Sequence, residues 1–490
     1  MCYLKLVSKS LIRRCKSILL VTGAIALLSS CTVGPDYVKP TAEVPVAFKE
    51  MNGWTMAQPK DNLIKGAWWE MFNDMQLNSL EGQVDAANQN IAVAEAQFRQ
   101  ARAQVAAARA GYFPTVTVNP SATRSRSSAN LGRGVSASGL ASGTTSNNFI
   151  LPADASWELD LWGKVRRSVE AGKASAQASA ADLESTRLII HAELAQDYFQ
   201  LRVLDAQKQV LDATVVNYAH FLEVTKNRYA SGVASRAEVL QAETQFKTTQ
   251  AQAIDIGVQR AQMEHAIAVL IGKPASVFSI SFSPLSTAIT PAIPVALPSK
   301  LLERRPDIAA AERLVAAANA QIGVAEAAFY PSITLSASGG FQASSMSNWL
   351  TWPSRFWSVG TAISETVFDG GLRSALTDQA RAAYDATVAS YRQTVLTGFQ
   401  EVEDNLAALR ILEEEAKVEA EAVNAAQQSV IFTTNQYKAG TASSLDVIVT
   451  QNAELSNKRT EITIIGNRMT ASVLLIKALG GGWDVSALPH

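Results

Sequence analysis

Two segments of the chain alternate between apolar and polar side chains at every second residue. In residues 153–161 the odd-numbered positions are apolar and the even-numbered ones polar, and residues 332–341 follow the same rule with glycines near the end. A period of two with one apolar face is typical of a β-strand. A weaker pattern of this kind begins at residues 115–118, and a less regular one lies near residues 357–363. The sequence therefore predicts four strands.

The length of these segments indicates where the strands lie. About ten alternating residues are what a tilted membrane-spanning strand requires. Aromatic side chains favour the membrane–water interface, and several sit at the ends of these segments: Trp349, Trp352, Phe356 and Trp357. We therefore expect the strands to span a membrane, with tryptophans of surface loops as the alternative interpretation.

Two long stretches, residues 153–273 and 354–488, contain no proline. Proline is the strongest breaker of a helix interior, so long helices are permitted there. A helix over about residues 164–227 would be roughly 95 Å long at 1.5 Å per residue. Apolar residues follow two stripes along it: Leu188, Ala192, Ala195 and Phe199 form one, and Ile190, Leu194, Leu201 and Leu204 form the other. Two stripes predict a neighbour on each side. A coiled-coil rod is the alternative, and the strands argue against it.

The same order of elements occurs twice along the chain. Residues 94–116 are echoed by residues 311–333 at an offset of 217 (331 − 114), and Tyr229-x-x-Gly232 recurs as Tyr437-x-x-Gly440 at 208 (437 − 229). A duplicated unit of this size indicates one large supersecondary unit used twice. Each repeat is predicted to contain a helix, a strand, a loop, a strand, a long helix, a turn and a return helix.

Four strands cannot form a closed barrel on their own. In lipid, the unpaired amides and carbonyls of two open edges cost several kcal/mol each, so the sheet must close with other chains. Multiples of four allow 8, 12 or 16 strands, meaning a dimer, a trimer or a tetramer with cyclic symmetry. The periodicity leaves that choice open.

Composition adds two constraints. The formal net charge is −1, from 43 basic and 44 acidic residues, so no basic field favours nucleic acid as a partner. Residues 121–148 are almost entirely small and polar apart from arginine, so they cannot bury a core. We expect this segment to be a solvent-facing loop between the two strands of the first repeat.

The N-terminus carries the signals of a processed segment. A basic region precedes an apolar run over residues 18–28, which is too short to span a bilayer. The run ends in Leu28-Ser29-Ser30-Cys31, which resembles a bacterial lipobox, so residues 1–30 are expected to be a signal peptide and Cys31 the lipid attachment site. An ordinary signal peptide is the alternative. The other cysteines, Cys2 and Cys15, lie upstream, so no disulfide is expected.

Five motifs together resemble one family, the TolC-like outer membrane factors or outer membrane efflux proteins, in the lipoprotein branch typified by OprM and NodT. The resemblance covers essentially the whole mature chain. The motifs that carry it are Cys31-Thr32-Val33-Gly34-Pro35-Asp36-Tyr37-x-x-Pro40, Trp68-Trp69-x-x-Phe72, Leu301-Leu302-Glu303-Arg304-Arg305-Pro306-Asp307-Ile308, Phe329-Tyr330-Pro331 and Val367-Phe368-Asp369-Gly370-Gly371. The resemblance implies a mainly α fold with membrane β structure. Three copies would form a 12-stranded β-barrel in the outer membrane and a 12-helix α-barrel through the periplasm.

The resemblance also implies partners and a location. The homotrimer would be the exit duct of a tripartite efflux pump in a Gram-negative bacterium, passing drugs or other small solutes. Its partners would be a periplasmic adaptor protein, an inner-membrane transporter of the RND type and outer membrane lipid, into which the lipid on Cys31 anchors it. Thr32 agrees with the outer membrane, because the usual inner-membrane retention signal is Asp at that position. No cofactor other than the covalent lipid is expected.

Domain boundaries follow from the repeat and the resemblance. Residues 31–80 are expected to be the lipid-anchored and equatorial segment, 81–273 the first repeat and 307–480 the second. Residues 274–306 form a proline-rich equatorial linker between them, and residues 481–490 a C-terminal tail.

The two turns of the long helices are the expected periplasmic mouth. Tyr229 and Gly232 in the first repeat, and Tyr437 and Gly440 in the second, lie where the helices must reverse, and glycine suits the residue that ends a helix. Adaptor hairpins are predicted to dock there as helices in grooves.

A gate is expected just after Gly440. By resemblance, carboxylates past this glycine line a constriction, and Asp446 matches one such position. Where relatives often carry a second Asp this chain has Val449, and where some carry Arg it has Asn452. The mouth is therefore expected to combine an apolar constriction of Leu445 and Val449 with one charged ring at Asp446, whose alternative role is that of a solvated helix residue.

The chain carries no signature of an enzyme. The four histidines are scattered, without H-E-x-x-H or cysteine partners, and no phosphate loop occurs, so neither catalytic nor metal-binding residues are expected. Each histidine is expected at a helix surface or terminus. Two other functions stay open: the outer membrane duct of a protein secretion system, and a periplasmic adaptor or scaffold lipoprotein built from helical hairpins. The transported substrate and the matching transporter and adaptor cannot be read from the sequence.

Overall fold

The computed structural model describes residues 32–50, 66–128, 145–284, 293 and 302–489. These residues form two compact units, and each takes segments from both repeats. The first unit contains residues 100–176 and 313–388 together with the N-terminal segment up to Lys39, and the second contains residues 40–99, 177–312 and 389–490. Residues 1–31, which include Cys31, and residues 285–292 and 294–301 of the proline-rich linker lie outside the described residues.

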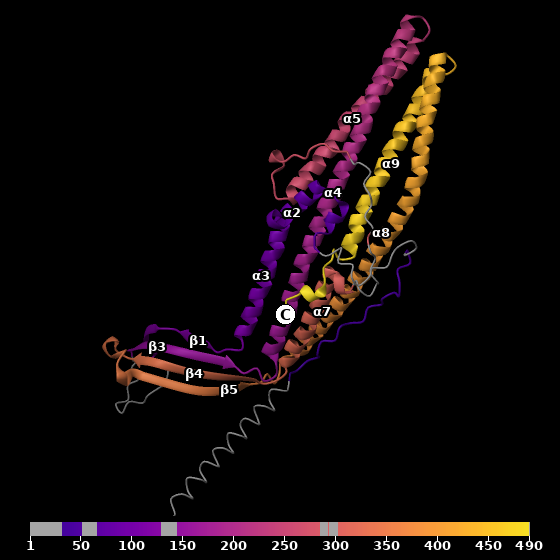
Figure 1. The fold of residues 1–490 in the computed structure, drawn as a ribbon. Helices are drawn as coiled ribbons and strands as arrows, with labels where there is room; N and C mark the ends of the chain where they lie inside the picture. Colours follow the sequence, from indigo (N-terminus) through magenta and orange to yellow (C-terminus); the bar gives the residue numbers. More distant parts are fainter. Residues whose placement is uncertain (1–31, 51–65, 129–144, 285–292, 294–301, 490) are drawn as a thin grey trace, which may run out of the picture. The chain divides into compact units, whose positions relative to one another are not determined.

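The first unit is built on an antiparallel sheet. Its strands are β1 (Thr115–Val118), β2 (Ser121–Arg126), β3 (Thr145–Glu158), β4 (Ser332–Ala343) and β5 (Arg355–Ser364), and the order is β1-β3-β4-β5 with β2 also beside β3 (Figure 1). The four predicted strands are therefore confirmed. The end of β3 differs from the prediction, because Leu159 and Leu161 lie beyond its last residue.

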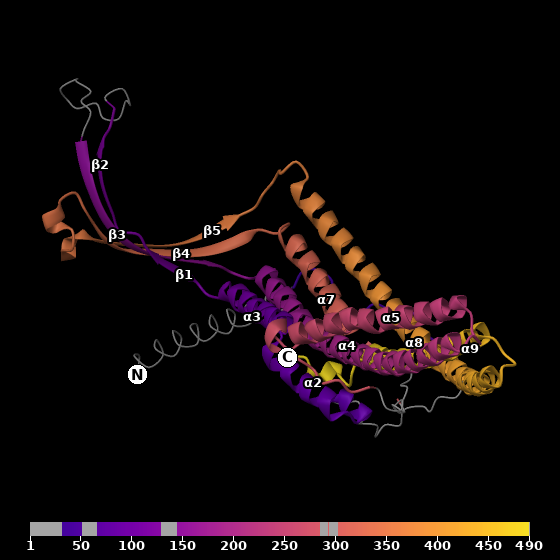
Figure 2. The same cartoon turned by 90° about the horizontal axis from the view of Figure 1, so that it is seen from above.

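Strands β1 and β2 are two pieces of one strand. Val118 lies opposite Ala153 and Ser121 opposite Ile150, so both pieces pair with β3 in a single register (Figure 2). The interruption falls at Pro120, which has no N–H to donate to a ladder. This corrects the expectation of a loop over residues 121–148, because β2 and the first residues of β3 belong to the sheet. Small polar residues can pair in a ladder since the backbone supplies the hydrogen bonds.

The two faces of the sheet differ in polarity. Residues directly opposite in a ladder share a face, so Ala155 lies beside Val116 on one side and Ala337 on the other, and Ala337 lies beside Val359. Continuing this register gives one apolar face: Val116, Val118, Leu151, Ala153, Trp157, Ile333, Leu335, Phe341, Trp357, Val359 and Ile363. The opposite face carries mainly Ser, Thr and Asp. The apolar residues at the outer strands are exposed, with Trp357 81 % and Val359 75 % exposed.

The N-terminal segment of the first unit is fixed to the start of a helix. Arg167 is buried, donates to the carbonyls of Val33 and Gly34 and pairs with Asp36 at 2.9 Å. Asn319 donates to the carbonyl of Pro35 at 2.9 Å. The residues that follow Cys31 are thus held in place by side chains of α4 (Lys164–Ala230) and α7 (Pro306–Ala327).

The second unit contains two helical hairpins. One joins α4 to α5 (Arg236–Leu270), and the other joins α8 (Leu372–Ala439) to α9 (Ser444–Ala478), and in each the return helix runs beside the long one (Figure 1). The first residues of α4 and α8 belong to the first unit. Shorter elements complete the fold: η2 (Trp68–Phe72), α2 (Met75–Ala87), α3 (Gln89–Ala110), η3 (Ala275–Val277), η4 (Met346–Asn348), η5 (Trp352–Ser354) and η6 (Val485–Ala487).

The predicted apolar stripes of α4 are buried. Ala192, Ala195, Leu194 and Leu201 have no exposed surface, and Ile190, Phe199 and Leu204 are also buried, whereas Leu188 is partly exposed. Burial of side chains on both stripes confirms that the helix has neighbours on more than one side. Within the described part of the chain, none of the helices combines the length and the apolar character that crossing a membrane requires.

Candidate functional site

The hairpin turns have the same backbone conformation in both repeats. Gly232 follows α4 with φ of 75° and Gly440 follows α8 with φ of 79°, a left-handed conformation in which a Cβ is strained. Ser235 and Ser443 then cap the return helices. The chain thus reverses at the predicted glycines, whereas their role in adaptor docking stays a prediction.

The two tyrosines beside these turns have different environments. Tyr437 is 2 % exposed and its ring lies 5.4 Å from that of Phe221 on α4. The guanidinium carbon of Arg228 lies 4.4 Å from the centre of the Tyr437 ring, and its Nη1 donates to the Tyr437 carbonyl at 2.8 Å. Tyr229, its counterpart in the first repeat, is 47 % exposed. The two hairpins of one chain are therefore joined near their turns through Tyr437.

The predicted gate residues lie on the exposed side of the first turns of α9. Leu445 and Val449 are 53 % and 58 % exposed. Val447 and Ile448 between them are buried in a cluster with Phe221 and other apolar residues. One side of this helix end is thus fixed to the neighbouring hairpin, while the other presents two large apolar side chains to the surroundings.

Asp446 has a structural role that the sequence analysis missed. Its carboxylate accepts from the backbone N–H of Ser443 at 2.9 Å and from the Ser443 hydroxyl at 2.7 Å, which completes a capping box. These bonds from the Ser443 side chain and backbone lower the pKa of Asp446, so the exposed carboxylate stays ionised. Glu238 completes the same box in the first repeat. The spacing Ser-x-x-Asp/Glu was the signal that identifies both.

Asn452 also has partners that explain its position. Its Oδ1 accepts from the Tyr218 hydroxyl at 3.2 Å and from Gln245 Nε2 at 2.6 Å. It therefore links α9 to both helices of the first hairpin. Asn452, which the sequence indicated only as a break in a charged ring, thus connects three helices.

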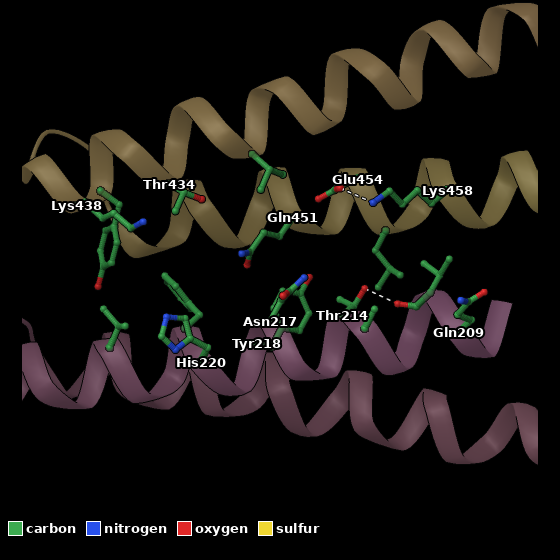
Figure 3. Close-up of a pocket in the computed structure, with 17 residues that line it drawn as sticks. Gln209, Thr214, Asn217, Tyr218, His220, Thr434, Lys438, Gln451, Glu454 and Lys458 are labelled. Carbon is green, nitrogen blue, oxygen red and sulfur yellow. Dashed lines mark hydrogen bonds and ion pairs between the residues drawn. The ribbon is translucent and has the colours of Figure 1, made fainter. Parts of the chain in front are cut away.

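A cavity of about 490 Å³ lies next to this contact, between α4, α8 and α9. In Figure 3 polar side chains from the three helices face one another across it. Labelled there are Gln209, Thr214, Asn217, Tyr218 and His220 on α4, Thr434 and Lys438 on α8, and Gln451, Glu454 and Lys458 on α9.

Further from the turns, a buried ion network fixes the first hairpin. Asp205 has no exposed surface and accepts from Arg202 at 2.9 Å and from Arg260 at 2.7 Å. Its carboxylate also accepts from the backbone N–H of Ser283, and Arg260 donates to the carbonyl of Ile280. The network joins α4, α5 and the chain that follows α5. Sequence patterns did not reveal it, because its members are far apart along the chain.

One histidine does not lie where the sequence placed it. His191 was expected at a helix surface, but it is buried, with its Nδ1 2.6 Å from Glu81 Oε2 and its ring stacked on Trp69 at 4.5 Å. Burial raises the pKa of Glu81 to about 7, although His191 opposes the shift. Burial also disfavours the charged imidazole, but Glu81 and Asp85 outweigh it and raise the pKa of His191. The expectation failed because α2 packs on α4 here, a contact that local periodicity does not encode.

Comparisons with known proteins agree with this architecture. The family model described as "Outer membrane efflux protein" matches residues 80–273 and 297–481. The chain is 31 % identical over 472 residues to "Probable efflux pump outer membrane protein TtgC" of Pseudomonas putida, covering 96 % of each chain. It is 30 % identical to "Pyoverdine export outer membrane protein OpmQ" of Pseudomonas aeruginosa, covering 85 % of this chain and 87 % of the relative.

A solved structure resembles the fold over nearly its whole length. The outer-membrane channel OprN has a TM-score of 0.86 at 30 % identity, with 92 % of this chain and 100 % of that chain covered. The sheet and the paired hairpins described above are therefore the fold of an outer membrane efflux channel.

Proposed function

Because the chain belongs to the outer membrane efflux protein family, we propose that three copies assemble into the exit duct of a tripartite pump. The protein is an outer membrane channel of an efflux system. Our proposal adds the copy number, the partners and the gate: a periplasmic adaptor docks at the hairpin turns, and an inner-membrane transporter of the RND type supplies the energy.

The main support for this assembly is that both edges of the sheet are open. Within the described residues, β5 and the β1–β2 strand each have a strand neighbour on one side only. An open edge in lipid leaves backbone groups without partners at a cost of several kcal/mol each. The exposed apolar face, with Trp357 and Val359, fits contact with lipid, and the polar face fits an aqueous lumen. Closure between chains satisfies both requirements.

Cross-linking tests this assembly directly. Downstream of Cys31 the sequence has no cysteine, so introduced thiols are unambiguous. Thr117→Cys on β1 combined with Ala362→Cys on β5 should give dimers and trimers with a short bismaleimide in outer membranes. As a control, Ser156→Cys with Ser336→Cys joins two neighbours in one ladder and should give only cross-linked monomer. Monomer from both pairs would refute closure between these edges.

The gate is proposed at Leu445, Asp446 and Val449. Because Asp446 also caps α9, its charge and its cap must be separated. Asp446→Asn keeps an acceptor for the cap and removes the charge, whereas Asp446→Ala removes both. We expect both variants to raise single-channel conductance and antibiotic leakage, and Glu238→Gln in the first repeat to leave them unchanged. Equal conductance of Asp446→Asn and the wild type would assign Asp446 to capping alone.

Adaptor docking is proposed at Gly232 and Gly440, with Tyr229 and Tyr437 beside them. A Cβ on either glycine would meet no heavy atom within 4 Å, so the space is open to a partner. Gly440→Ala adds backbone strain without bulk, and Gly440→Trp adds both. The tryptophan variant alone should lose efflux and adaptor pull-down while remaining trimeric. Normal efflux by Gly440→Trp would exclude docking at this turn.

The lipid anchor is proposed at Cys31. Its support is the lipobox in the sequence and the firm attachment of the residues that follow it, through Arg167. Mass spectrometry of the mature N-terminus should show a lipid-modified Cys31, and Cys31→Ser should remain unmodified. An unmodified cysteine, or cleavage elsewhere, would contradict the assignment.

Cargo is the part of the function that the chain does not specify. Among similar relatives, one name refers to an efflux pump without stating a cargo and another to pyoverdine export. Deleting the gene and comparing susceptibility to antibiotics, dyes and metals should identify the exported solutes. Unchanged susceptibility together with loss of a secreted protein would instead support a secretion duct.

A further inference from the structure

The cavity between α4, α8 and α9 contains polar atoms that the protein leaves unsatisfied. Within the described part of the chain, the Tyr437 hydroxyl and Gln451 Oε1 are buried and have no hydrogen-bond partner. Both residues line the cavity, from α8 and α9. Buried polar atoms normally have partners, so a hydroxyl that donates or accepts and a carbonyl that accepts are both free to bind a molecule inside the cavity.

The walls of the cavity suit a flat ring. Tyr218, Phe221 and Tyr437 contribute aromatic surface, and all three are buried, with Leu455 beside them. The volume of about 490 Å³ lies within the range typical of small-molecule sites. Polar side chains from all three helices line the rest of the cavity, so a ligand there needs polar groups as well as a ring.

The charges at the cavity favour an acid. Glu454 is neutralised by Lys458, whose Nζ lies 2.6 Å from its carboxylate. Lys438 is the other lysine that lines the cavity, and His220 lies on α4 across from it (Figure 3). The cavity therefore has one cationic side chain in excess, next to Tyr437 in the chain.

We propose that this cavity binds a small aromatic carboxylate that also carries a hydrogen-bond donor. The carboxylate pairs with Lys438 and accepts from the Tyr437 hydroxyl, the ring lies among Tyr218, Phe221 and Tyr437, and the donor reaches Gln451 Oε1. Such a ligand contacts both hairpins of one chain. Binding therefore stabilises their packing against each other, and the site does not depend on which solute the channel exports.

The test uses a probe with these groups, 6-hydroxy-2-naphthoate. We expect saturable heat of binding in isothermal titration calorimetry with the full-length protein in detergent, after subtraction of empty micelles. The ligand should also raise the unfolding temperature, since it binds only the folded state. Two analogues separate the groups: 2-naphthoate lacks the donor, and 2-naphthylmethylamine replaces the acid with a cation. The first should bind roughly 3- to 10-fold more weakly, as expected for one lost hydrogen bond, and the second should not bind.

Four variants locate the site. Tyr437→Phe removes only the hydroxyl and should weaken binding roughly 3- to 10-fold, and Lys438→Gln should weaken it further. Ala213→Trp fills the cavity from α4 and should abolish binding. Residue 219 on the same helix does not line the cavity, so Ala219→Trp should bind the probe as the wild type does.

Three results would overturn the proposal. They are no binding of 6-hydroxy-2-naphthoate beyond the micelle control, unchanged binding by Ala213→Trp, and equal binding of the amine and the acid. The variants' folding is checked by circular dichroism and trimer content, so loss of structure is not mistaken for loss of the site.

Discussion

The two hairpins of this chain share a backbone plan and differ in what surrounds it. Both return helices have 35 residues, both begin with a capping box, and both follow a glycine with positive φ. Beside the turn, however, Tyr437 is buried under Arg228 while Tyr229 is half exposed. The features that the backbone conformation requires are thus the same in both repeats, whereas the packing of the neighbouring side chains differs.

The middle of the long helices shows the same divergence. At the offset of 208, His191 corresponds to Phe399 and Asp205 to Glu413 (399 − 191 and 413 − 205). In α4 both are buried with charged partners, whereas Phe399 packs on Phe48 at 6.4 Å and Glu413 forms an exposed pair with Lys417. At these two related positions the first hairpin is thus held by buried charge, and the second by aromatic packing and an exposed ion pair.

The sharpest test of this difference is removal of the carboxylate at the two related positions. Asp205→Ala leaves the buried Arg202 and the partly exposed Arg260 without their shared partner, so the free energy of unfolding of the first hairpin should fall by about 3–5 kcal/mol. Glu413→Ala should leave the free energy of unfolding of the second hairpin unchanged, because exposed ion pairs contribute little. Hydrogen exchange of α4 and α5 amides measures the first variant, and that of α8 and α9 amides measures the second. Similar losses in the two variants would show that the repeats are not held differently.

The tyrosines give the next largest effect. Tyr437→Ala empties a buried aromatic site and should lower the free energy of local opening at the turns by about 3 kcal/mol. Tyr229→Ala removes a half-exposed ring and should cost less than about 1 kcal/mol. Hydrogen exchange in the first turns of α9 reports the change in Tyr437→Ala, and exchange in the first turns of α5 reports that in Tyr229→Ala. Equal protection in the two variants would mean that Tyr229 is buried as deeply in the assembled protein.

The Glu81–His191 pair should make the first hairpin sensitive to pH. The pKa of Glu81 is raised to about 7 and that of His191 is raised as well, so the folded state binds protons more tightly than the unfolded state. Stability is then greatest at low pH and falls as pH rises from about 4.5 through 7. The protection factors of the α2 amides, meaning their exchange rates relative to those of an unfolded chain at the same pH, should be lower at pH 8 than at pH 6.

The double variant Glu81→Gln/His191→Phe is the control, since it removes both titrating groups and places at residue 191 the residue of the second repeat. The protection factors of its α2 amides should depend much less on pH over the same range. The same pH dependence in the wild type and in this variant would assign the effect to other groups.

The smallest effect should be shared by both repeats. Gly232→Ala and Gly440→Ala each place a Cβ in a left-handed conformation without any steric contact, so each should cost about 1 kcal/mol. Thermal unfolding of the two variants should give the same shift. A clearly larger shift for one of them would show that its turn is packed against another chain.

Sequence patterns were sufficient wherever an element is determined locally. Strand alternation, the absence of proline and the turn glycines placed β1, β4, β5 and both hairpins close to their observed bounds, and found only the second half of β3. They failed at β2, where the polar residues 121–126 pair with β3. This pairing continues the register in which Val118 of β1 lies opposite Ala153. Composition does not report on a partner strand.

In the candidate site too, the locally determined features were predictable and those that depend on packing were not. The turns around Gly232 and Gly440 were found from sequence, and the capping role of Asp446 could have been. The contacts of Asn452 and the burial of His191 could not, because Tyr218, Gln245 and Glu81 approach them only after the helices pack.

The pairing pattern of the sheet has one more consequence. The β1–β2 pieces count as one strand, so the described residues of each chain supply an even number of strands, and the first and last of these run in opposite directions. In the proposed ring, adjacent copies would therefore meet in antiparallel pairing whatever their number, and parity places no limit on the ring. The diameter of the pore is left to strand tilt and to the packing of side chains around it.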